Sequence, residues 1–76
     1  MTMNQMKTGD FATVQRLDVR GGARRRLQDL GLIEGTYIEC LQKSPLGDPV
    51  AYLIRGAVIA IRSDESSRIL ISEKTS

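Results

Sequence analysis

Residues 30–57 read LGLIEGTYIECLQKSPLGDPVAYLIRGA, a stretch in which glycine and proline recur at strand-length intervals. The glycines lie in three clusters, at residues 30–36, 44–49 and 55–57. Glycine supplies positive φ angles and proline pre-sets the first position of a turn, so each cluster marks a reversal of the chain. The stretch therefore predicts a small antiparallel sheet, which leaves almost no room for catalytic machinery.

Short apolar runs on either side of these clusters predict five strands. We expect them at residues 10–18, 36–43, 50–55 and 57–62, with a last strand around Ile69 and Ile71. A bulge before Leu17 would return that side chain to the core face. The residues expected to face the core are Ala12, Val14, Leu17, Ile38, Cys40, Val50, Tyr52, Ile54, Ile59, Ile61, Ile69 and Ile71. This pattern predicts a mainly β fold, a closed or nearly closed small five-stranded barrel.

One short helix is expected after the first strand, at residues 23–30. Ala23, Leu27 and Leu30 recur at helical spacing and form one stripe that must dock on the sheet. Gly31 stands where a left-handed C-terminal cap belongs. A further helical turn is expected at residues 63–68, with Ser63 as its N-cap. The neighbouring carboxylates Asp64 and Glu65 fit the start of that turn better than a cation site.

Length and composition limit the class of protein. The 76 residues predict one domain over residues 1–76 with a core at about 7–72, preceded by a loosely held start whose Met3 and Met6 are available to pack at the barrel edge. The net charge is +2, and no apolar run approaches the ~20 residues that span a bilayer. Without a signal peptide, the expected compartment is the reducing cytosol.

The chain contains no histidine and one cysteine, Cys40. The commonest general base and the commonest transition-metal ligand are therefore both missing, and a lone thiol has no second thiolate with which to hold zinc. We expect no catalytic site, no metal site and no cofactor, and we assign Cys40 to the core. Nucleic acid is not an expected partner, because no aromatic platform interleaves with the arginines.

The order of these elements resembles the FeoA family over residues 7–72. The matching residues are Gly9, Ala12, Val14, Arg26-Leu27, Leu30-Gly31-Leu32, Glu34-Gly35-Thr36, Pro45-Leu46-Gly47-Asp48-Pro49, Gly56, Ile59-Ala60-Ile61-Arg62, Ile69 and Ile71. Two departures stand out: Ser66 replaces the usual alanine, and Arg24 and Arg25 extend a pattern that asks only for arginine before Leu27.

The resemblance implies an SH3-like β-barrel that serves as the small cytoplasmic component of bacterial ferrous iron uptake. It also implies a partner, the membrane GTPase-transporter FeoB, through which alone the protein would reach the membrane. The chain is similar as well to the C-terminal SH3-like domain of metal-dependent transcriptional repressors. That second interpretation is disfavoured because no helix-turn-helix and no metal-ligand set accompanies it.

Five residues are candidates for a partner surface: Arg24, Arg25, Pro45, Leu46 and Gly47. Three cations in the first turns of a helix oppose its positive N-terminal dipole. The arginine triplet is therefore either a solvated face or a contact for an acidic partner or a phosphate group. Leu46 lies at a loop tip between prolines, where it either binds a partner or folds back onto the barrel.

Tyr37 and Leu41 fall on the non-core face of the second predicted strand. They either lie beneath the helix or the N-terminal segment, or they form an exposed apolar patch of the kind that marks partner surfaces.

Overall fold

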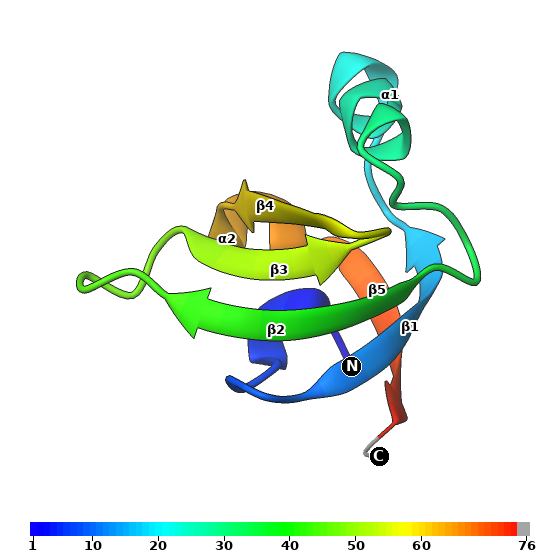
Figure 1. Ribbon diagram of the computed structural model, residues 1–76. Helices are drawn as coiled ribbons and strands as arrows, with labels where there is room; N and C mark the ends of the chain where they lie inside the picture. The colour runs from blue at the N-terminus through cyan, green and yellow to red at the C-terminus, as the bar shows by residue number, and fades with distance from the viewer. Residues whose placement is uncertain (75–76) are drawn as a thin grey trace.

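The computed structural model describes the backbone of residues 1–74 and the side chains up to Ser72. Five strands form one antiparallel sheet in the order β4-β3-β2-β1-β5 (Figure 1). The elements are η1 (Met3–Gln5), β1 (Phe11–Leu17), α1 (Gly21–Asp29), β2 (Tyr37–Lys43), β3 (Val50–Ile54), β4 (Ala57–Ile61), α2 (Ser63–Ser66) and β5 (Ile69–Lys74). The predicted mainly β fold with one short helix after the first strand is therefore confirmed.

Closure of the predicted barrel is not confirmed. Within the described chain, the hydrogen-bonded order begins at β4 and ends at β5, and no ladder joins these two strands. The sheet curls around the core as Figure 1 shows, with α2 and η1 on its concave side. The fold is an open, curled sheet with two edges.

Strand parity follows the sequence prediction. The register of β1 against β5 shifts between Val14 and Arg16, so the bulge expected before Leu17 is present and Leu17 is buried. A second irregularity between Cys40 and Gln42 was not expected. Arg55 (φ 50°) and Gly56 (φ 83°) form the two-residue turn from β3 to β4, both in the left-handed region that such hairpins require. The predicted core residues are buried, and Ile59 packs against them half-buried.

The N-terminal segment differs from the expectation of a loosely held start. Met3 and Met6 belong to the core cluster, and Met3 is completely buried. Thr2 forms an isolated bridge with Leu70, and the Ile71 N–H donates to the Met1 carbonyl at 2.9 Å. The core therefore begins before residue 7, because two flexible apolar side chains fill the space inside the curled sheet.

Helix α1 ends in the cap that the sequence predicts. Gly31 has φ 103°, its N–H donates to the Gln28 carbonyl at 2.9 Å, and the Leu32 N–H donates to the Leu27 carbonyl at 3.0 Å. These two bonds define a Schellman motif, and its hydrophobic pair, Leu27 with Leu32, is fully buried. The expected stripe is wrong at Ala23, which is exposed because the helix begins at Gly21 and stands away from the sheet (Figure 1).

Helix α2 spans Ser63–Ser66, but the predicted N-cap at Ser63 is wrong. Arg62 occupies the N-cap position without a side-chain cap bond, and the Ser63 N–H instead donates to Asp48 Oδ1 at 2.8 Å. Asp64 and Glu65 lie in the first turn, as expected for a helix-start role. The carboxylate that stabilises this helix start thus comes from the loop between β2 and β3.

Candidate interaction surfaces

Leu46 lies at the tip of the loop of residues 44–49 and is 95% exposed. The Gly47 N–H donates to the Ser44 carbonyl at 2.8 Å, which closes a turn around Pro45 and Leu46. The Ser44 N–H donates to the Pro49 carbonyl at 3.2 Å, and Asp48 anchors the loop base to Ser63. Of the two alternatives for Leu46, folding back onto the sheet is therefore excluded, and the leucine projects from an anchored loop.

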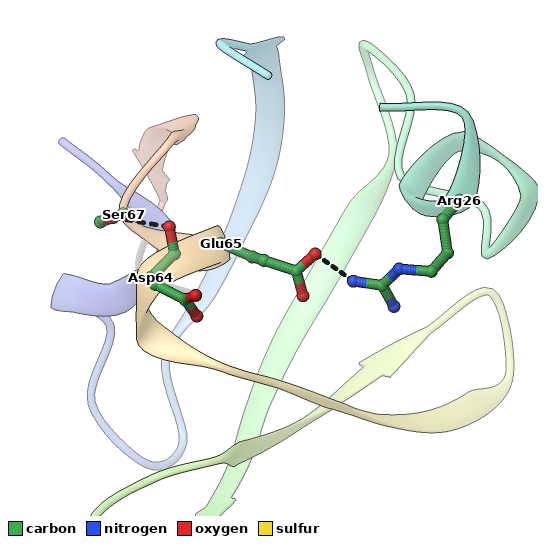
Figure 2. A network of polar contacts seen from close by, with 4 residues as sticks. All are labelled: Arg26, Asp64, Glu65 and Ser67. Atoms are coloured by element: carbon green, nitrogen blue, oxygen red, sulfur yellow. Dashed lines mark hydrogen bonds and ion pairs between the residues drawn. The ribbon is translucent and has the colours of Figure 1, made fainter. Parts of the chain in front are cut away.

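The three arginines of α1 have three different environments. Arg24 is partly buried, and its Nη1 donates to the Leu17 carbonyl at 2.6 Å and the Val19 carbonyl at 3.4 Å. Arg25 is exposed. Arg26 hydrogen-bonds to Glu65 and so links α1 to α2 across the fold (Figure 2). The bond to Glu65 raises the pKa of Arg26 above its usual value.

The five predicted site residues do not converge. Figure 1 shows α1 and the β2–β3 loop at opposite ends of the molecule, with the sheet between them. Arg24 and Arg25 therefore cannot share one small patch with Pro45, Leu46 and Gly47. Arg24 in addition has a structural role, since its guanidinium donates to the carbonyl of the last β1 residue, Leu17, and to that of Val19 just after the strand.

An open groove of about 490 Å³ was not predicted as a site. Its residues come from the outer face of β1, β2 and β3 and from the loop before β2, and they include Phe11, Ile33, Tyr37 and Leu53. The Phe11 and Tyr37 rings stack with centroids 5.5 Å apart and planes at 16°. Tyr37 is 52% exposed, so it contributes to an exposed apolar patch and does not lie beneath the helix or the N-terminal segment. Leu41 is half-buried.

The alternation of inward and outward side chains along β1 and β2 is the sequence signal that could have identified this groove. Phe11 precedes the inward Ala12, and Tyr37 precedes the inward Ile38. Their side chains must therefore emerge on the same outer face of two paired strands. The missing information was the register, in which Phe11 pairs with Glu39 and Thr13 pairs with Tyr37, placing the two rings diagonally side by side.

Among the residues whose side chains the structure describes, the buried titratable groups are Cys40 and Tyr52. Cys40 is fully buried, as expected, and burial raises the pKa of its thiol. Burial also raises the pKa of Tyr52 to about 12, and the Tyr52 hydroxyl donates to the Met3 carbonyl at 3.4 Å. Among the described residues, no three histidine, cysteine or carboxylate side chains gather as they would around a metal ion. No helix in the described part of the chain has the length and apolar character needed to cross a bilayer.

The small curled sheet of five antiparallel strands, with one short helix after its first strand, is the architecture of small SH3-like β domains. Within this class the chain belongs to the FeoA family, because the FeoA domain model matches residues 1–73. The FeoA family is involved in ferrous iron transport as an accessory family and is not a known enzyme family. The predicted resemblance is therefore confirmed.

Known relatives agree with this assignment. The chain is 33% identical over 69 residues to the Fe(2+) transport protein A/Fe(2+) transporter FeoB fusion protein of Porphyromonas gingivalis, covering 91% of this chain and 8% of that protein. The solution structure of FeoA from Chlorobium tepidum superposes with a TM-score of 0.90 at 34% identity, over 96% of this chain and 70% of that one. The chain thus spans a small fraction of the curated relative.

The crystal structure of FeoA from Stenotrophomonas maltophilia, solved in complex with zinc and described as a prokaryotic SH3 domain protein, has a TM-score of 0.82. Its sequence is 25% identical, and the match covers 95% of this chain and 89% of that one. A manganese-dependent transcriptional repressor matches over 97% of this chain and 36% of its own, with a TM-score of 0.87 but 18% identity. The likeness to the repressor shows a shared fold alone.

Proposed function

We propose that this protein is a non-enzymatic accessory protein of bacterial ferrous iron uptake that binds and modulates a FeoB-type membrane GTPase-transporter. It would act in the cytoplasm and reach the inner membrane through that partner. The fusion protein of P. gingivalis supports the proposal, since there a segment 33% identical to this chain shares a polypeptide with FeoB. Joining two modules in one chain raises their effective concentration and suits partners that act together.

The docking contact that we propose is the loop tip formed by Pro45, Leu46 and Gly47. The exposure of Leu46 is the observation that carries this proposal: a large apolar side chain 95% exposed on an anchored loop. The turn at Ser44 and Gly47 and the bond from Ser63 to Asp48 fix the loop before any partner arrives. Pre-organisation of this kind lowers the entropic cost of binding.

Arg24 and Arg25 would contribute differently. At the opposite end of the molecule from the loop (Figure 1), their charges lie outside a contact centred on Leu46. Of the two, Arg25 is exposed and free to steer an acidic partner, whereas Arg24 is already bonded to the Leu17 carbonyl. We therefore assign the electrostatic contribution mainly to Arg25.

The test is the affinity of single variants for the cytoplasmic GTPase domain of a FeoB-type transporter. Leu46→Ala should weaken binding by about 1–2 kcal/mol if the side chain enters a pocket of the partner. Its melting temperature should stay within a few degrees, because the side chain has no role in the core. Gln28→Ala changes an exposed, uncharged residue on α1, at the end of the molecule opposite the loop, and is the control that should leave affinity unchanged.

Unchanged binding by Leu46→Ala would remove the loop from the docking surface.

Association rates measured at two salt concentrations distinguish the roles of Arg24 and Arg25. Arg25→Ala should slow association and flatten its salt dependence without changing stability. Arg24→Ala should also destabilise the fold by about 1–2 kcal/mol, since it leaves the Leu17 carbonyl without its partner.

A role in metal-dependent transcription is the second function that the fold permits. The repressor likeness at 18% identity supports the architecture only. The fusion with FeoB favours the transport role.

A further inference from the structure

Strand β4 (Ala57–Ile61) forms an uncovered edge of the sheet. Its sequence is AVIAI, with no charged residue, no proline and no bulge in its pairing with β3. Ala57, Val58 and Ala60 are exposed, Val58 to 68%. Natural sheet edges are usually blunted by charge, proline, a bulge or a covering segment, and this strand has none of these within the described chain.

The hairpin turn determines which backbone groups face outward. A two-residue turn makes Ile54 and Ala57 a hydrogen-bonded pair, and the alternation that follows also bonds Tyr52 to Ile59 and Val50 to Ile61. Val58 and Ala60 therefore direct their N–H and C=O groups away from β3. Neither residue makes a backbone hydrogen bond outside the sheet among the described residues. The edge thus offers two donors and two acceptors in strand spacing.

The side chains of these two residues continue the outer face of the sheet. Val58 pairs with Leu53, which lines the large groove beside the Phe11–Tyr37 stack. Ala60 pairs with Ala51, and both line a second, smaller groove of about 210 Å³ near Pro49. An added strand would therefore place every second side chain beside an existing apolar surface.

The charges around β4 distinguish between two possible occupants of this edge, a second copy of this chain and a segment of another polypeptide. Exposed arginines flank the strand, Arg55 in the turn before it and Arg62 directly after it. Antiparallel pairing of two copies through β4 would bring Arg62 of each copy close to the Arg55–Gly56 turn of the other, which like charges disfavour. Asp48 offsets Arg62 weakly, at 3.9 Å. The groove that Arg55 lines also contains two carboxylates, Glu39 on β2 and Glu34 in the loop before β2.

We propose that β4 is a docking edge for an extended segment of another polypeptide, which adds to the sheet as a further strand. The complementary segment is apolar at alternate positions and has a carboxylate at each end to meet Arg55 and Arg62. Main-chain bonds to Val58 and Ala60 supply affinity, and the flanking charges supply selectivity. This inference does not depend on which protein contributes the segment.

The test uses a capped synthetic peptide of alternating valine and threonine with one glutamate at each end. Titrated into ¹⁵N-labelled protein, it should shift the amide signals of β4 and slow hydrogen exchange at Val58 and Ala60. A peptide with lysine in place of both glutamates should bind at least tenfold more weakly. A peptide N-methylated at two consecutive central amides, which blocks both of its edges, should not bind.

Two protein variants complete the test. Ala60→Pro removes an outward N–H that the sheet does not use, so it should abolish binding while the fold is retained. Arg55→Gln with Arg62→Gln should remove the preference for glutamate over lysine, whereas Arg25→Gln on α1 should preserve it. Shifts confined to another surface, no binding by the glutamate peptide, or self-association through β4 would each overturn the proposal.

Discussion

The two edges of the sheet differ in how the chain treats them. On β5, Thr2 bridges Leu70 and the Met1 carbonyl accepts the Ile71 N–H, so the N-terminal segment lies along that strand. On β4, Ala57, Val58 and Ala60 are exposed, and no segment of the described chain covers the strand. One molecule therefore contains a protected edge and an unprotected edge of the same sheet.

This difference shows that one segment can both protect a sheet edge and complete the hydrophobic core. The segment that covers β5 also inserts Met3, completely buried, into the space enclosed by the curled sheet. Burying a methionine side chain contributes about 1.5–3 kcal/mol, so the covering segment is held by the core as well as by strand hydrogen bonds. The residues that follow β4 form α2, and among the described residues they do not cover that strand as the N-terminal segment covers β5.

The largest expected effect comes from breaking the cover on β5. Met3→Ala should destabilise the fold by about 2–4 kcal/mol, because it leaves a cavity and loosens the segment. For a domain of this size, that lowers the melting temperature by roughly 10 °C or more. Chemical denaturation measures the change. Val58→Ala on the open edge is the matched control and should stay within about 0.5 kcal/mol. Equal effects at the two positions would refute the contrast between the edges.

A smaller effect is expected at Cys40, which lies in the core near the covering segment. Its Sγ is 4.0 Å from the Met6 carbonyl. Cys40→Ser should destabilise the protein by about 1–3 kcal/mol, since a buried hydroxyl gains no assured partner. Urea denaturation measures the loss, and a thiol reagent should label the native wild-type protein slowly. Rapid labelling would show that Cys40 is accessible and that the segment does not seal the core.

The smallest expected effect is a pH dependence at Tyr52, whose hydroxyl bonds to Met3 of the same segment. Its pKa is about 12 in the fold, against about 10 in an unfolded chain. Below pH about 10 both states are protonated and the contribution is fully present. As the pH rises from about 10 to about 12, only the unfolded state ionises, so stability falls.

Urea midpoints at about pH 9 and about pH 11 measure this loss. Tyr52→Phe should remove the part of the slope that belongs to Tyr52. An unchanged slope in the variant would mean that this tyrosine ionises as readily in the folded protein as in the unfolded chain.

The strands could be predicted from local patterns, whereas the edges could not. Alternation identified the inward residues, and the parity break at Leu17 predicted the bulge that the register of β1 and β5 contains. The sequence marks Met3 as available to pack at the barrel edge, but its complete burial depends on a cavity that exists only after the five strands have assembled. The sequence predicted a closed or nearly closed barrel and could not decide between the two, because strand count and length do not determine whether the first and last edges meet.

The candidate surfaces were predicted in part for a similar reason. The loop around Leu46 was found because its prolines and glycine are local signals, and its exposure agrees. The contacts of Arg24 and Arg26 depend on Leu17 and Glu65, which are brought near α1 only by the fold. Whether these residues bind a partner stays a prediction.

The β1–β5 ladder also determines how the chain can assemble. Val14 and Ile71 are paired although more than fifty residues separate them, whereas a two-residue turn joins β3 to β4. Closing a loop of that length costs about 3.5 kcal/mol of chain entropy, before any strand contact returns it. The meander β2–β3–β4 has short connections, so its strands pair without the entropic cost of closing a long loop. We therefore expect the folding rate of this small domain to depend on its topology more than on the local preferences of its strands.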